Sequence, residues 1–202
     1  MGEVIEFKTG KERREARFWQ RFFAGAEIGV ELRFLTLNSS DESVVLGFDI
    51  LDSFRKFVKR VRRKYGVFEY FAVVGEAVDE PLRKHMHVIF KGVYMPQREL
   101  EDMWVDVHRS IKPYIKKVKS VKGAANYLAR YMHQQSCNRY IMSAGWVFKG
   151  WVYWSKWYKK NFGKYPQQVM PDVFGYLANK SEDERNKLIM PELMALDKKR
   201  RK

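Results

Sequence analysis

An apolar, β-branched run with two histidines two residues apart constrains the fold more than any other part of the chain. In a β-strand, residues i and i+2 point to the same face. Met86, Val88 and Phe90 are therefore expected to face a core, with His85 and His87 side by side on the opposite face. Two imidazoles on a rigid strand can bind one divalent metal ion. The alternative is a strand with two half-buried polar histidines.

The charge of the chain points to a polyanionic partner. Its 202 residues include 39 Lys and Arg against 24 Asp and Glu, a net charge of +15, and the pI is near 9.8. Nucleic acid fits this charge better than a membrane does, because no apolar run approaches the length that spans a bilayer. The alternative is a basic surface that is merely solvated.

Four further features narrow the class of protein. Hydrophobic residues make up 46% of the chain, enough for a real core. Cys137 is the single cysteine, which argues against a disulfide framework or a cysteine-based zinc site. The N-terminus lacks the charged-then-apolar pattern of a signal peptide, so we expect a cytoplasmic protein. No glycine-rich nucleotide loop of the Gly-x-x-x-x-Gly-Lys type is present, so no ATPase is predicted.

Hydrophobic periodicity predicts an α+β fold. A helix capped by Asp52 or Ser53 is expected to run to Lys64, with Gly66 just past its end. The predicted order of elements from residue 31 is strand 31–38, this helix, strand 67–76, strand 85–91, a helix after Pro96, strand 114–118 and helix 121–134. This order is typical of a ferredoxin-like or RRM-like antiparallel sheet, with helices on one face and a site on the other.

The chain divides into four predicted segments. They are an N-terminal helical segment (1–30), a core (31–135), an aromatic and basic extension (136–180), and a short helix with a basic tail (181–202). In the extension, aromatic side chains among lysines suit the stacking of single-stranded bases. Core packing is the better interpretation for most of its tryptophans, which are Trp146, Trp151, Trp154 and Trp157.

Two tyrosines on one predicted helix are candidate nucleophiles. Tyr127 and Tyr131 are four residues apart, so both hydroxyls leave the same face of the helix. A tyrosine oxygen can attack a phosphodiester and retain the 5′ end as a phosphotyrosine. A phenol with a pKa of about 10 is a weak nucleophile, so this chemistry needs a divalent metal to polarise the phosphate. The alternative is a pair of amphipathic packing tyrosines.

Three motifs in order resemble those of the HUH endonucleases, in which two histidines flank a hydrophobic residue. The family includes rolling-circle replication initiators, relaxases and some transposases. The motifs are the strand Phe34-Leu35-Thr36-Leu37-Asn38, the pair His85-Met86-His87, and the helix Tyr127-Leu128-Ala129-Arg130-Tyr131. The resemblance covers residues 31–135, and the two tyrosines resemble the initiators of small single-stranded DNA phages and some plasmids.

The resemblance implies a set of site residues. His85 and His87 would bind Mg²⁺ or Mn²⁺, with Glu76 as a third ligand, and a hard cation does favour a carboxylate oxygen. Tyr127 and Tyr131 would be catalytic, and whether one or both attack is left open. The residues expected to contact DNA are Thr36, Asn38, Lys84, Lys122 and Arg130.

Two departures from the family pattern affect how the cut phosphate is positioned. Arg130 stands where lysine is usual, which keeps the charge but loses a compact ammonium. Gln134 replaces a second lysine that two-tyrosine members often carry.

The implied function is metal-dependent nicking and joining of single-stranded DNA at an origin, through a covalent protein–DNA linkage. The partners implied are a host polymerase that extends the 3′ hydroxyl and a separate helicase, with a plasmid or virus as the genetic home. The oligomeric state is left open. The alternatives are an HUH transposase or relaxase, and a non-enzymatic module that binds single-stranded nucleic acid.

Overall fold

The computed structural model describes seven ranges of the chain, which are 9–26, 30–76, 82–92, 94–111, 113–132, 140–147 and 159–160. The chain separates into a sheet unit, Glu31–Ala144, and a second unit formed by Met1–Val30 and Gly145–Lys202. Trp151, Trp154, Trp157, Gln134, Cys137 and the predicted segment 181–202 lie outside the described residues. The division into four segments stays a prediction.

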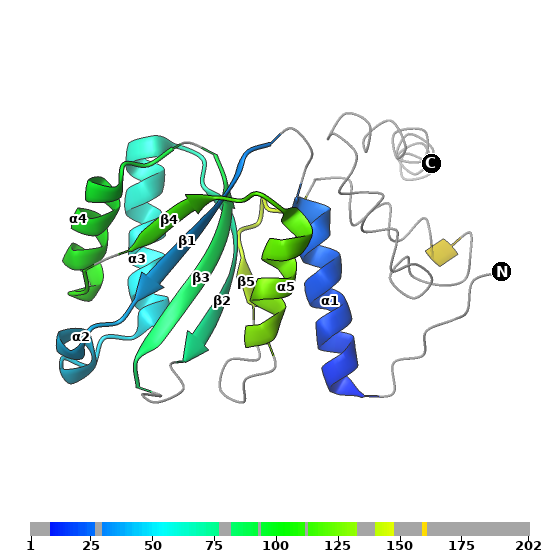
Figure 1. Ribbon diagram of the computed structural model, residues 1–202, viewed down its shortest axis with the longest axis horizontal. Coiled ribbons are helices and arrows are strands. Elements are labelled where there is room, and N and C mark those ends of the chain that lie inside the picture. Colours follow the sequence, from blue (N-terminus) through cyan, green and yellow to red (C-terminus); the bar gives the residue numbers. More distant parts are fainter. Residues whose placement is uncertain are drawn as a thin grey trace, which may run out of the picture. The chain divides into compact units, whose positions relative to one another are not determined.

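The sheet unit contains a five-stranded antiparallel sheet in the order β4-β1-β3-β2-β5 (Figure 1). The strands are β1 (Leu32–Asn38), β2 (Glu69–Glu76), β3 (Lys84–Lys91), β4 (Tyr114–Lys117) and β5 (Tyr140–Met142). Because β1 and β2 are each antiparallel to β3, they run parallel to each other with β3 between them. This interleaving is the split βαβ pattern of a ferredoxin-like fold, so the predicted α+β architecture is confirmed.

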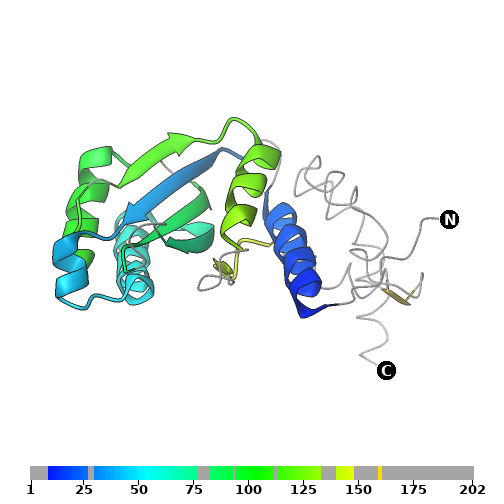
Figure 2. The same cartoon turned by 60° about the horizontal axis from the view of Figure 1, so that its bottom comes forward.

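In the described part of the sheet unit, four helices join these strands. They are α2 (Asp41–Val45), α3 (Ile50–Tyr65), α4 (Gln97–His108) and α5 (Val121–Tyr131). Side chains of α3 and α4 pack against one face of the sheet, and in Figure 2 the strands lie between these two helices and α5. The core they enclose includes Met86, Val88 and Phe90, all fully buried as the strand pattern predicts.

The second unit contains α1 (Gly10–Gly25). Its Phe18 and Phe22 are buried, and the fully buried Trp146 donates a hydrogen bond from Nε1 to the Arg21 carbonyl oxygen at 3.0 Å. Trp146 is therefore a packing residue, as expected for most tryptophans of the extension. Among the described residues, no helix combines the length and apolar character needed to cross a bilayer.

The start of α3 differs from the sequence prediction. Asp49, rather than Asp52 or Ser53, is the N-cap, and its carboxylate accepts from the Asp52 backbone N–H at 2.9 Å. Asp is a strong N-cap residue, and the earlier of two acids three residues apart takes the role here. The helix ends at Tyr65, one residue after the predicted Lys64. Gly66 follows its end as predicted and caps it with a φ of 82°, a conformation that suits glycine.

Buried His108, at the end of α4, connects this helix to α3 and to the end of β1. Its Nε2 lies 2.9 Å from Ser39 Oγ, just after β1, and its Nδ1 lies 2.9 Å from Ser53 Oγ on α3. The imidazole also packs 4.6 Å from the ring of Trp104. Both ring nitrogens are thus satisfied inside a layer that water does not reach, which makes the neutral imidazole the stable form.

This network predicts that acid weakens the fold through His108. Burial lowers the pKa of His108 to about 4, against a smaller opposing effect of Asp49. Between about pH 6.5 and 4 the unfolded chain therefore binds more protons than the folded chain. The contribution of His108 to the free energy of unfolding is complete above pH ~6.5 and is lost as the pH falls toward 4. Denaturant unfolding of wild type should lose on the order of 2–3 kcal/mol more over this range than His108→Gln. The same dependence of the free energy of unfolding on pH in wild type and His108→Gln would contradict this prediction.

Candidate active site

The strand register gathers the predicted site on the sheet face that α3 and α4 leave uncovered. Directly paired residues of neighbouring antiparallel strands share a face. One row across the sheet therefore consists of Tyr114, Thr36, His87, Val73 and Tyr140. The row on one side of it includes Asn38, His85 and Gly75, and the row on the other side includes Lys116, Phe34 and Ile89.

The two histidines stand side by side, as predicted. Their ring centroids are 4.7 Å apart and the rings are steeply inclined to each other. His87 is buried, with 4% of its surface exposed. Its Nδ1 lies 3.2 Å from Thr36 Oγ1 and its Nε2 lies 3.4 Å from the Tyr127 hydroxyl, so both ring nitrogens have a defined neighbour.

Helix α5 brings both tyrosines onto this pair. Ser120 caps the helix by accepting from the Gly123 N–H at 3.0 Å, and Ala125 and Leu128 are buried. The Tyr131 hydroxyl donates to the Tyr127 hydroxyl at 2.9 Å. Spacing of four residues thus places the two hydroxyls in contact, next to the imidazoles, as the sequence indicates.

The hydrogen bonds form a chain with a consistent direction. If Tyr127 donates in turn to His87 Nε2, then His87 Nδ1–H donates to Thr36 Oγ1. Thr36 thereby selects the tautomer that leaves a lone pair on Nε2. Sequence reasoning assigned Thr36 to DNA binding, and it missed this contact because only the β1–β3 register shows that Thr36 pairs with His87.

The environment keeps both imidazoles neutral. Burial, together with smaller effects of the neighbouring His85 and Lys116, lowers the pKa of His87 to about 3. Burial also lowers the pKa of His85, and Glu76 opposes this effect. Burial, followed by the hydrogen bond with Tyr127, raises the pKa of Tyr131 above that of an ordinary phenol. At neutral pH the site offers imidazole lone pairs, the form that binds metal ions.

Gly75 was not singled out by the sequence, yet the site depends on it. It pairs with His85 across β2 and β3, and a Cβ at this position would lie 2.3 Å from His85 Nε2 and 2.7 Å from Tyr131 Cδ1. No other residue leaves room for both rings. The absence of a side chain opposite a functional histidine is the signal that identifies Gly75.

The remaining predicted residues do not all lie on the face of the histidines. Asn38 shares the face of the histidines, and Lys122 and Arg130 are exposed on α5. Glu76 and Lys84 pair with each other and follow the alternation of Val74 and Met86, which belongs to the opposite face. In the described ranges, no three side chains of His, Cys, Asp and Glu gather closely enough to hold a metal ion. The two imidazoles suit a metal ion, and Glu76 as the third ligand stays a prediction.

Comparison with known proteins gives a family match. The model of the family described as replication-associated protein ORF2/G2P matches residues 32–136, which include every element from β1 to α5. No curated protein matches the chain. Among solved structures, the hypothetical protein ORF119 from Sulfolobus islandicus rod-shaped virus 1 is similar, with 15% identity and a TM-score of 0.38 over 62% of this chain and 97% of that one.

Substitution of Gly75 should damage the fold through identifiable contacts. Gly75→Ala forces His85 and Tyr131 apart, so the free energy of unfolding should fall by about 1–3 kcal/mol. In a His85→Ala background the nearest atom is gone while Tyr131 Cδ1 remains, so the cost of Gly75→Ala should shrink but not vanish. Denaturant unfolding of the four proteins measures both costs.

Gly10→Ala is the control for this experiment, because a Cβ there meets only Arg14 Nη1, at 3.9 Å. An equal cost of Gly75→Ala in both backgrounds would contradict the steric explanation.

Proposed function

Because the chain belongs to the replication-associated protein ORF2/G2P family, we propose that it is a replication initiator that nicks and rejoins single-stranded DNA as a two-tyrosine HUH endonuclease. The observation that supports this most is the meeting of two tyrosine hydroxyls with an adjacent, neutral pair of histidines between α5 and the sheet face opposite α3 and α4. Packing alone would not require four polar rings to converge there.

The proposed reaction is a transesterification. A tyrosine oxygen attacks the scissile phosphorus, a Tyr–O–P bond forms, and the bond between phosphorus and the 3′ oxygen breaks. The phenolic proton is lost and the leaving 3′ oxygen gains one, so the products are a 5′-phosphotyrosine and a free 3′ hydroxyl. One phosphodiester replaces another, so the reverse attack by a 3′ hydroxyl joins strands without ATP.

We assign the first attack to Tyr127. Its hydroxyl accepts the hydrogen bond of Tyr131 and lies beside His87 Nε2, whereas the Tyr131 hydroxyl acts as donor. A donor aimed at the attacking oxygen stabilises the negative charge that develops there. Tyr131 would then serve the second transfer.

His85 and His87 are the residues that would hold Mg²⁺ or Mn²⁺, and Glu76 would contribute a carboxylate if its side chain turns to their face at the end of β2. When bound, the cation supplies polarisation of the scissile phosphate and neutralisation of its charge. Thr36 orients His87, and the exposed Arg130 and Lys122 of α5 attract the DNA backbone. A host polymerase and a helicase remain the proposed partners.

Substitution of the tyrosines tests the proposal. A randomised single-stranded library with labelled flanks is incubated with Mn²⁺ or chelator, and covalent adducts are resolved on a denaturing gel. Tyr127→Phe should abolish the adduct, since it lacks the attacking oxygen. Tyr131→Phe should still form it, about 10-fold more slowly, because one hydrogen bond to the nucleophile is lost.

The histidine pair provides the accompanying control. His85→Ala with His87→Ala should remove metal-dependent cleavage while most binding, which depends on charge, persists. A wild-type level of adduct from Tyr127→Phe would refute the assignment of the nucleophile. Binding by wild type without cleavage in any metal would favour a non-enzymatic module.

Thr36→Val separates two roles of Thr36. The substitution keeps the shape but removes the oxygen next to His87 Nδ1. If Thr36 orients the imidazole, the Mn²⁺ concentration for half-maximal cleavage should rise about 10- to 100-fold, and DNA affinity in chelator should not change. The opposite result, weaker DNA binding with an unchanged Mn²⁺ requirement, would restore Thr36 to the DNA contacts.

A further inference from the structure

A cavity opens between β4 and the first half of α5, directly beside Tyr127. Its volume is about 640 Å³, and its walls include Phe34, Tyr114, Lys116, Lys119, Ser120 and Tyr127. This volume lies within the range of roughly 300–1,000 Å³ that is usual for small-molecule sites. It is large enough for one nucleotide, and one of its walls is the proposed nucleophile.

The walls combine aromatic rings with unpaired positive charge. Lys116 Nζ lies 5.2 Å from the centroid of Phe34 and 5.7 Å from that of Tyr114, so two rings hold the ammonium at the cavity wall. Lys116 and Lys119 are exposed, and neither has a carboxylate partner within the described part of the chain. Tyr114 has 56% of its surface exposed. Exposed rings and lysines together suit a base and its phosphate.

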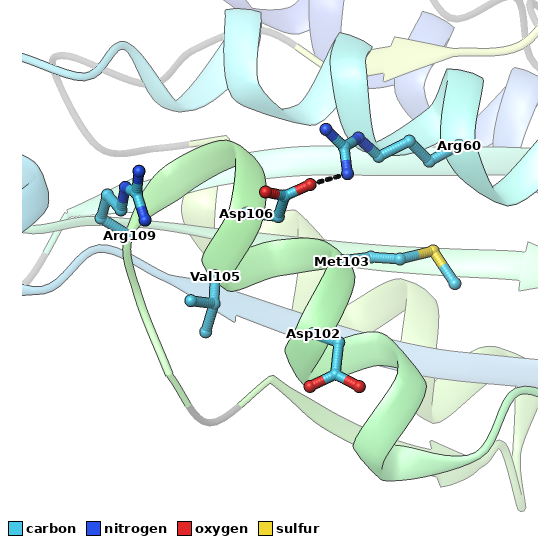
Figure 3. Close-up of a pocket in the computed structure, with 6 residues that line it drawn as sticks. All are labelled: Arg60, Asp102, Met103, Val105, Asp106 and Arg109. Atoms are coloured by element: carbon cyan, nitrogen blue, oxygen red, sulfur yellow. Dashed lines mark hydrogen bonds and ion pairs between the residues drawn. The ribbon is translucent and has the colours of Figure 1, made fainter.

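A second cavity, between α3 and α4 on the opposite face, shows how specific this combination is. Its volume is about 440 Å³. Figure 3 shows that Asp106 points to Arg60 there and that Asp102 is also on the wall. Two carboxylates balance the two arginines and no aromatic ring lines this cavity, so it offers neither the net positive charge nor the stacking surface of the first.

We propose that the cavity beside Tyr127 holds the nucleotide next to the scissile phosphate, with its base stacked on Tyr114 and its phosphate on Lys116 and Lys119. This inference rests on the proposed function, because it makes the cavity the part of the active site that selects the flanking nucleotide. The register supports it: Tyr114 pairs with Thr36, which pairs with His87, so a strand that crosses β4 reaches the histidines directly.

Binding without cleavage tests the cavity separately from the reaction. Fluorescence anisotropy with a labelled oligothymidylate of about twenty nucleotides, in chelator, gives the affinity of each variant. Tyr114→Ala should bind about 5- to 150-fold more weakly, the usual cost of losing one stacked base, and Tyr114→Phe should bind like wild type. Lys116→Ala should also flatten the dependence of log affinity on log salt by about 0.7.

Matched controls come from the same unit. Tyr94 is 57% exposed, as Tyr114 is, but lies outside the cavity, so Tyr94→Ala should bind like wild type. Lys59 is an exposed lysine of α3 on the opposite face, and Lys59→Ala should keep the wild-type salt dependence.

Photocrosslinking identifies the contact. The same oligothymidylate with 5-iododeoxyuridine should crosslink to Tyr114, as read by mass spectrometry of the peptides. A crosslink elsewhere, or equal affinities of Tyr114→Ala and Tyr94→Ala, would overturn the inference even if the enzyme cuts DNA. If the wild-type protein forms the Tyr114 crosslink but cleaves no DNA, the proposed reaction is overturned and the cavity remains a binding site.

Discussion

The register of β3 between β1 and β2 is the constraint on which the rest of the site depends. Met86, Val88 and Phe90 on one face of β3 are fully buried against α3 and α4, and the alternate positions carry His85 and His87. A slip of one residue would place both imidazoles in that core and turn the apolar side chains toward the face where α5 lies. Each apolar side chain contributes about 1.5–3 kcal/mol by burial. The packing of the helical layer therefore fixes the histidines on the other face.

Local sequence periodicity was enough to predict which side chains share the site face. It was not enough to predict which residues of neighbouring strands contact each other. Spacing of two residues placed the histidines on a common face, and spacing of four put both tyrosines on one side of α5. Gly75 and the contact of Thr36 with His87 follow only from pairing between strands distant in sequence. Glu76 shows the same limit: its place at the end of β2 suggested a ligand, whereas its alternation matches the core face. The metal ligands and the DNA contacts stay predictions.

Positive charge and burial act together on the histidines. Lys116 lies one row away from His87 and disfavours its protonation, as the neighbouring imidazole does, so their effects add to that of desolvation. The same lysine, held between Phe34 and Tyr114, also adds to the field that attracts a phosphate. A chain with a net charge of +15 thus favours both the imidazole form that binds a cation and the approach of a polyanion.

The two tyrosines differ because a helix rises about 6 Å over four residues. Tyr131 reaches the end of the site near Gly75 and His85, while Tyr127 lies against Phe34 and the cavity beside β4. Their hydroxyls nevertheless meet at 2.9 Å, a separation shorter than two phosphates tolerate. A phosphoryl group on Tyr127 would occupy the space next to the Tyr131 oxygen. In the proposed reaction the pair therefore shares one phosphate position, and the tyrosines act in turn rather than side by side.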